Sequence, residues 1–171
     1  MDAGSQDEAY RHAAAEYGPA LERLARAAEA DRAERHDLLQ EIHFALWRSL
    51  ANFDGRCSMR TWVYRVAHNT AATHVAARRR QPKGVSIEEL DLIDEHAGPE
   101  TVASEHQMLQ RLMAMIRELK PLDAQVMLLY LEDLDAAGIG EITGLSAGAV
   151  ATKISRVKSV LAKRFEGGGD A

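Results

Sequence analysis

Apolar residues recur every three or four positions along most of the chain, and the first 80 residues lack the strict alternation that marks a β-strand. This pattern predicts an all-α fold. The predicted helices of the first half span residues 7–30, 32–50 and 59–80. Pro19 lies inside the first range and is expected to interrupt that helix or to begin its second part. A loop over residues 52–58 precedes the third helix, for which Ser58 is a suitable N-cap.

The second and third of these helices each have one apolar side, which predicts a shared core. These sides consist of Leu38, Ile42, Ala45 and Leu46 on the second helix, and of Trp62, Val66, Thr73 and Ala77 on the third. Trp62 is therefore expected to pack in the core. Tyr64, Arg65 and His68 are expected to face elsewhere and to be available to a ligand.

The second half of the chain predicts two helices, residues 104–119 and 121–132, followed by a helix-turn-helix. Gly144 can take the left-handed conformation that ends a helix, and Ser146 can cap the next one by accepting a backbone N–H bond. The last helix carries an apolar stripe of Val150, Ile154, Val157 and Leu161. Its opposite side consists of Gly148, Thr152, Ser155, Arg156, Ser159 and Lys163.

Between the two halves, residues 81–100 contain two prolines, two glycines and many acids, with one short helix expected near residues 86–90. This segment predicts a linker. The organisation is therefore two small helical domains, residues 7–80 and 102–166, joined by an acidic linker, residues 81–101.

Composition sets limits on what the chain can be. It has 171 residues, of which 46% are hydrophobic and 27% charged, as expected of a chain that folds. It has no apolar run long enough to cross a bilayer, and its polar N-terminus does not resemble a signal peptide. A single cysteine, Cys57, fits a reducing compartment, so we expect a cytoplasmic protein with no membrane insertion.

The net charge of −5 is distributed unevenly. Residues 56–80 hold six arginines and no acid, and residues 145–165 hold five cations and no acid. A cationic helix of a helix-turn-helix is typical of DNA binding in the major groove, although a solvated basic face explains the same pattern. Arg78, Arg79 and Arg80 are expected to contact backbone phosphate or simply to favour the helix end.

Enzymatic and metal chemistry find no support in the sequence. It has no phosphate-binding glycine loop and no set of nucleophile, base and orienting group. The histidines are scattered, and His36 with His43 supply only two of the ligands that a zinc site needs. We expect no cofactor, no metal and no catalytic activity.

Three stretches of the first half resemble regions 2.1 to 2.4 of the bacterial extracytoplasmic-function (ECF) sigma factors of RNA polymerase. They are residues 37–47 (DLLQEIHFALW), 52–55 (NFDG) and 58–69 (SMRTWVYRVAHN). The second half resembles region 4 of the same family. A region 2 motif followed by a region 4 motif is more specific than either alone. The resemblance extends over about residues 7–165.

The resemblance implies a transcription initiation factor that binds the clamp of the largest core RNA polymerase subunit and promoter DNA, under the control of an anti-sigma factor in a stress or envelope response. It also implies a nucleoid location when active. The implied polymerase-binding residues are Asp37, Leu38, Gln40, Glu41, Phe44 and Trp47. The implied -10 contacts are Arg56, Arg60, Tyr64, Arg65, His68 and Asn69. The implied -35 contacts are Thr152, Lys153, Ser155, Arg156, Lys158 and Lys163, with Arg156 suited to guanine and Lys158 and Lys163 to phosphate.

Some positions depart from the family pattern. Ala149 and Ala151 replace polar residues of the recognition helix, and Gly138 and Gly140 lie in the helix before it. Each glycine costs about 0.8–1.0 kcal/mol relative to alanine in a helix interior, and Gly140 is expected to permit a close helix crossing. His68 replaces an arginine and either makes DNA affinity depend on pH or is inert. Two other functions remain open: a helix-turn-helix regulator that does not act through polymerase, and a sigma mimic that sequesters an anti-sigma factor.

Overall fold

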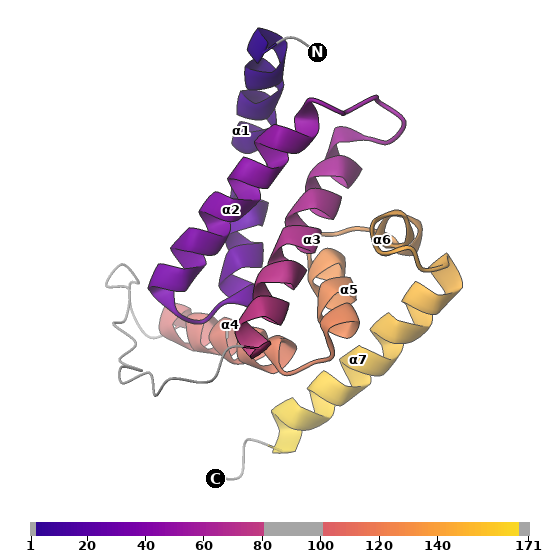
Figure 1. Cartoon of the computed structure of the whole chain (residues 1–171). Coiled ribbons are helices and arrows are strands. Elements are labelled where there is room, and N and C mark those ends of the chain that lie inside the picture. Colours follow the sequence, from indigo (N-terminus) through magenta and orange to yellow (C-terminus); the bar gives the residue numbers. More distant parts are fainter. Residues whose placement is uncertain (1–2, 81–100, 168–171) are drawn as a thin grey trace.

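The computed structural model describes residues 3–80 and 101–167, which form seven α-helices and no strand (Figure 1). The first three are α1 (Ala3–Ala28), α2 (Arg32–Leu50) and α3 (Met59–Arg80). The others are α4 (Thr101–Arg117), α5 (Pro121–Leu131), α6 (Ala136–Thr143) and α7 (Ala147–Gly167). The predicted all-α fold is confirmed. The acidic residues of the linker and its expected short helix lie outside the described residues.

Helices α1, α2 and α3 pack against one another around the first core cluster. Its fully buried side chains include Leu21, Leu38, Ile42, Leu46, Leu50 and Val63. The expected interruption at Pro19 is wrong, because α1 runs through it as one helix. Buried residues on both sides of the proline, Ala13 and Leu21 among them, hold the helix against the same core.

The buried side of α3 is rotated from the one that the sequence pattern predicts. Val63, Ala67 and Ala71 lie in the core, whereas Thr73 and Ala77 are exposed. Trp62 packs partly buried against this core, as expected, and its Nε1 donates to the Ser49 hydroxyl at 3.0 Å.

Local signals at the helix ends are confirmed. The Ser58 hydroxyl accepts the Thr61 N–H at 3.0 Å, and the Ser146 hydroxyl accepts the Ala149 N–H at 3.2 Å. Gly144 ends α6 with φ of +79°, in the left-handed region. Gly144 and Ser146 together set the turn between α6 and α7.

The two halves of the chain are packed together. Figure 1 shows α3 lying between α2 and the pair α5 and α6, with α7 on the outside. One core cluster joins both halves, since it contains Ala20 and Tyr64 with Val126, Leu129, Leu134, Ile139, Ile142 and Val150. We call this packing of α1 and α3 against α5 and α6 the closed arrangement. Among the described residues, no helix is both long and apolar enough to pass through a bilayer.

Candidate nucleic-acid interface

The exposed side of α7 carries most of the predicted -35 residues. Thr152, Ser155, Arg156, Lys158 and Lys163 are exposed, whereas Val150, Val157 and Leu161 anchor the opposite side in the core. The Thr152 hydroxyl donates to the backbone oxygen of Gly148 at 3.0 Å, so it is turned toward the helix itself. The helix therefore has one polar, cationic side that is exposed and one apolar side that is packed in the core, as a groove-binding helix requires.

Two cations of α7 share one carboxylate of α5. The Lys153 Nζ lies 2.6 Å from Asp123 Oδ1, and the Arg156 Nη2 lies 3.3 Å from Asp123 Oδ2. The side chains of Asp123, Lys153 and Arg156 are 11%, 23% and 63% exposed. The buried carboxylate thus fixes one end of each cation while most of Arg156 faces solvent.

A second α5 side chain holds Lys158. Its Nζ donates to the Tyr130 hydroxyl at 3.3 Å and stands 5.2 Å from the centre of the Tyr130 ring. Asp123 and Tyr130 are seven residues apart, which is about two helical turns, so both face α7 from the same side of α5.

Gly140 allows the close approach of the turn that precedes α7. A Cβ at this position would lie 2.6 Å from the Leu145 carbonyl oxygen, so only glycine fits without displacing backbone. The expected close approach at Gly140 is therefore to the turn between α6 and α7 and not to a crossing helix. Gly138 has a related reason, because its N–H donates to the capping Asp135 side chain at 2.7 Å and a Cβ would lie 3.1 Å from that oxygen.

The loop between α2 and α3 borders an open cavity of about 930 Å³. Its lining includes Arg56, Cys57, Trp62 and Arg65 from the first half and Glu141 from α6. Arg56 is exposed and pairs with Asp54 at 3.0 Å. The cavity has a mixed cationic and aromatic lining of the kind that holds unpaired bases, and Glu141 of α6 supplies one wall of it.

Three of the other predicted -10 residues, Arg60, Tyr64 and Arg65, contact the second half of the chain. The Arg60 Nη2 donates to the Glu132 backbone oxygen at 2.6 Å, and the Arg65 Nη2 donates to the Glu141 backbone oxygen at 2.7 Å. Tyr64 is buried and its hydroxyl donates to the Glu132 carboxylate at 3.2 Å. Asn69 remains exposed.

His68 is 4% exposed, so the expectation that it and Tyr64 face away from buried surroundings is wrong in the closed arrangement. Burial lowers the pKa of His68 to about 4, against a smaller opposite effect of Glu132. The imidazole is neutral at neutral pH. Burial, reinforced by Glu132, raises the pKa of Tyr64.

Glu132 is the centre of the contacts between the halves, and the sequence pattern did not indicate it. Its two carboxylate oxygens accept from the Arg23 Nε and Nη2 at 2.6 and 2.7 Å. Burial by itself would raise the pKa of Glu132, but hydrogen bonds and charge from Arg23, with Tyr64 and Arg60, lower it below its usual range. Arg23 and Glu132 are 109 residues apart, so no local signal could have paired them.

The predicted polymerase-binding side of α2 carries an exposed aromatic pair. Phe44 and Trp47 stack with ring centres 6.4 Å apart and are 60% and 37% exposed. The Trp47 Nε1 donates to Asp7 of α1 at 2.8 Å, which fixes the indole. Asp37 and Gln40 are also exposed, whereas Leu38 is fully buried in the first core and offers no surface.

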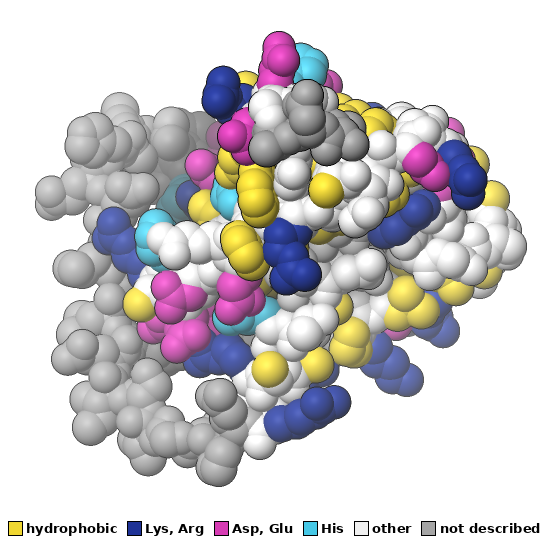
Figure 2. Space-filling view, turned by 45° about the horizontal axis from the view of Figure 1, so that its top comes forward, with side chains coloured by type: hydrophobic (Ala, Val, Ile, Leu, Met, Phe, Trp, Pro, Cys, Tyr) yellow, Lys and Arg dark blue, Asp and Glu magenta, His cyan; other side chains and the backbone are white. Residues whose placement is uncertain are grey.

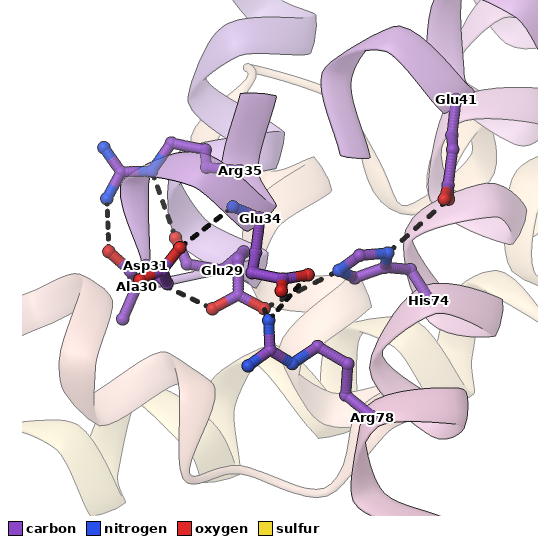
Figure 3. A network of polar contacts seen from close by, with 8 residues as sticks. All are labelled: Glu29, Ala30, Asp31, Glu34, Arg35, Glu41, His74 and Arg78. Atoms are coloured by element: carbon purple, nitrogen blue, oxygen red, sulfur yellow. Dashed lines mark hydrogen bonds and ion pairs between the residues drawn. The ribbon is translucent and has the colours of Figure 1, made fainter. Parts of the chain in front are cut away.

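Glu41 belongs to a polar network at the meeting point of α1, α2 and α3 (Figure 3). His74 lies between Glu41 and Glu29, with its Nδ1 and Nε2 at 3.5 and 3.6 Å from their carboxylates. Arg78 pairs with Glu29 at 3.2 Å and with Glu34 at 2.9 Å. Arg78 is therefore engaged within the chain, while Arg79 and Arg80 are exposed.

Figure 2 shows Lys and Arg side chains spread over one face as separate points rather than as a continuous patch, with acidic side chains gathered beside a histidine. His36 and His43 have different partners: Gln40 at 2.9 Å and the Tyr10 hydroxyl at 3.0 Å. Within residues 3–80 and 101–167, no group of three or more His, Cys, Asp or Glu residues is arranged to hold a metal.

Comparisons with known proteins agree with both halves. Sigma-70 region 2 matches residues 13–81, and sigma-70 region 4 matches residues 109–161. The RNA polymerase sigma-H factor of Pseudomonas aeruginosa is 29% identical over 151 residues, covering 80% of this chain and 75% of that protein. The ECF RNA polymerase sigma factor SigG of Mycobacterium tuberculosis is 27% identical over 151 residues, covering 75% of this chain but only 41% of SigG.

Among solved structures, CnrH in complex with the cytosolic domain of CnrY shares the fold, with a TM-score of 0.69 at 20% sequence identity. The match covers 96% of this chain and 91% of CnrH. Both family regions occur here in one chain and in order. The chain belongs to the ECF group of the sigma-70 family of RNA polymerase sigma factors.

Proposed function

We propose that this chain binds core RNA polymerase through the exposed face of α2 and directs it to specific promoters. The observation that carries the proposal is the pairing of region 2 and region 4 in one chain with an exposed aromatic pair where the polymerase contact is expected. Phe44 and Trp47 are large, apolar and held in place, which are the properties of residues that dominate protein interfaces. The protein acts by recruitment and carries out no chemistry of its own.

Promoter recognition is divided between the two halves. The exposed side of α7, with Arg156 foremost, reads the -35 element in the major groove. The proposed -10 surface consists of Arg56 and Arg65, which line the cavity beside the 52–58 loop, together with the exposed Arg60 and Asn69. Tyr64 and His68 are buried in the closed arrangement and join this surface only when the halves separate. Arg60 and Arg65 donate to backbone oxygens of the second half in the closed arrangement, so they need new acceptors when DNA binds. Promoter binding therefore requires the halves to separate.

Control by a second protein is part of the proposal. CnrH, which shares this fold, was solved bound to the cytosolic domain of CnrY. By analogy, an anti-sigma factor holds this chain inactive in the cytoplasm until a stress or envelope signal releases it to the nucleoid.

The test is gel filtration of the purified chain with bacterial core RNA polymerase, followed by transcription from a library of genomic fragments. Co-elution and transcripts that start at a defined set of promoters are the expected results. Co-elution without promoter-directed transcripts would favour a sigma mimic. DNA binding by a folded chain that ignores the polymerase would favour a helix-turn-helix regulator instead.

A further inference from the structure

We infer that Asp123, in the first turn of α5, is a positioning residue that sets how strongly α7 discriminates between -35 sequences. The inference rests on the proposed function, in which α7 enters the major groove. Asp123 does not touch DNA in this view. It acts through Lys153 and Arg156, with which it forms ion pairs from α5.

Arg156 uses only part of its guanidinium group to contact Asp123. Only its Nη2 contacts Asp123, at 3.3 and 3.4 Å from the two carboxylate oxygens. A guanidinium has five N–H donors in a planar fork, so the remaining donors can still reach a base edge. A side chain held in advance loses less freedom on binding, which favours one geometry of contact over many.

Lys153 is held more tightly and is less available. Its Nζ lies 2.6 Å from Asp123, and its side chain is far less exposed than that of Arg156. The carboxylate and the two cations together carry one net positive charge instead of two. Asp123 thus limits the contacts of both cations with backbone phosphates, and so reduces non-specific DNA binding.

This role differs measurably from that of an ion pair that merely joins α5 to α7. If Asp123 were only structural, its loss would loosen α7 and weaken binding to every DNA. If Asp123 positions Lys153 and Arg156, its loss should weaken discrimination between -35 sequences. Binding to unrelated DNA should become stronger, because the two released cations can each neutralise a phosphate.

The experiment compares full-length wild type, Asp123→Asn and Glu118→Gln, each in complex with core RNA polymerase. Glu118 pairs with Arg164 at 2.9 Å near the far end of α7, so its variant makes the same change of charge in the same domain. Wild type first selects a -35 sequence from duplexes randomised over promoter length. Affinities for that duplex, for single-base-pair variants of it and for an unrelated duplex are then measured over a range of salt concentrations, with thermal unfolding of each free protein.

For Asp123→Asn we expect discrimination at one or two -35 positions to fall about fivefold or more, which is part of the effect of losing a bidentate base contact. We expect affinity for the unrelated duplex to rise, with the slope of log affinity against log salt steeper by about 1 to 2, or 0.9 for each added phosphate contact. Glu118→Gln should change neither property. Asp123→Glu keeps the charge but moves the carboxylate, so it should lose discrimination with the salt slope unchanged.

Three results would overturn the inference. One is a folded Asp123→Asn protein that keeps wild-type discrimination. Another is a parallel loss of affinity for all duplexes, together with a lower unfolding temperature, in both Asp123 variants. The third is equal effects of Asp123→Asn and Glu118→Gln. A wild-type complex that selects no common upstream sequence would instead refute the proposed -35 role of α7, and the role of Asp123 would fall with it.

Discussion

Replacing Glu132 with glutamine should weaken the closed arrangement, because this carboxylate joins the second half of the chain to Arg23 and Tyr64 of the first. Glutamine keeps the shape of the side chain but cannot form the ion pair. Its amide oxygen can still accept one hydrogen bond, and the contact from Arg60 is retained because it goes to the backbone oxygen of residue 132. The change therefore isolates the charge of Glu132.

The magnitude follows from the geometry and the exposure of the pair. Both Arg23 donors lie 2.6–2.7 Å from carboxylate oxygens, and hydrogen bonds to charged groups contribute about 1.5–3 kcal/mol. The Arg23 side chain is 60% exposed, however, whereas that of Glu132 is 15% exposed, so solvent screens part of the attraction. We expect a net loss of about 1–2 kcal/mol, which shifts the ratio of closed to separated forms by a factor of about 5–30.

Amide hydrogen exchange over α3 and α6, with small-angle scattering of the free protein, measures this shift. Exchange in both helices and the radius of gyration should increase in Glu132→Gln, and exchange within α2 should not. Glu118→Gln is the matched control, since its ion pair with Arg164 lies within the second half. Equal exchange and equal size in Glu132→Gln and wild type would refute the view that this ion pair holds the halves together.

Further predictions concern the turn, the polymerase contact and pH. Gly140→Ala should lower the free energy of unfolding by about 1–3 kcal/mol, since its Cβ would meet backbone. Gly148→Ala, in open space in the first turn of α7, should raise it by at most the helix-interior value of about 0.8–1.0 kcal/mol, and a lower free energy of unfolding in both variants would contradict the steric argument. Phe44→Ala should weaken polymerase binding by about 2 kcal/mol in a titration and leave the unfolding temperature unchanged. Val160 is an exposed apolar residue of α7, and Val160→Ala should change neither polymerase binding nor the unfolding temperature. Because burial lowers the pKa of His68 to about 4, the unfolded chain binds more protons there between about pH 6.5 and 4. The free energy of unfolding should therefore fall as pH drops through that window, by up to about 3 kcal/mol, and denaturant titrations should show a flatter pH dependence for His68→Gln; an equal slope would count against a buried neutral imidazole.

Features with local causes could be predicted from the sequence. The helices follow from apolar spacing, and the helix ends at Ser58, Gly144 and Ser146 follow from capping chemistry that acts within three residues. The need for glycine at position 140 could be anticipated for the same reason, since the contact is with the next turn of chain.

Features that depend on distant partners could not be predicted. The continuity of α1 through Pro19 depends on packing against α2 and α3, which outweighs the local preference of proline. The roles of Glu132 and Asp123 depend on cations 109 and 30 residues away. In the linear pattern, both are ordinary polar residues of a helix.

The sequence by itself determined that this protein is a pair of helical units, each with one cationic helix and with sigma-factor motifs, because helix periodicity, caps and motifs depend on neighbouring residues. Only the tertiary structure decided that α3 is buried on two sides. One side packs in the first core through Val63 and Ala67, and the other meets the second half through Tyr64. A periodic pattern shows that a helix has an apolar side, but it does not show how many neighbours cover that helix, because coverage is set by long-range packing.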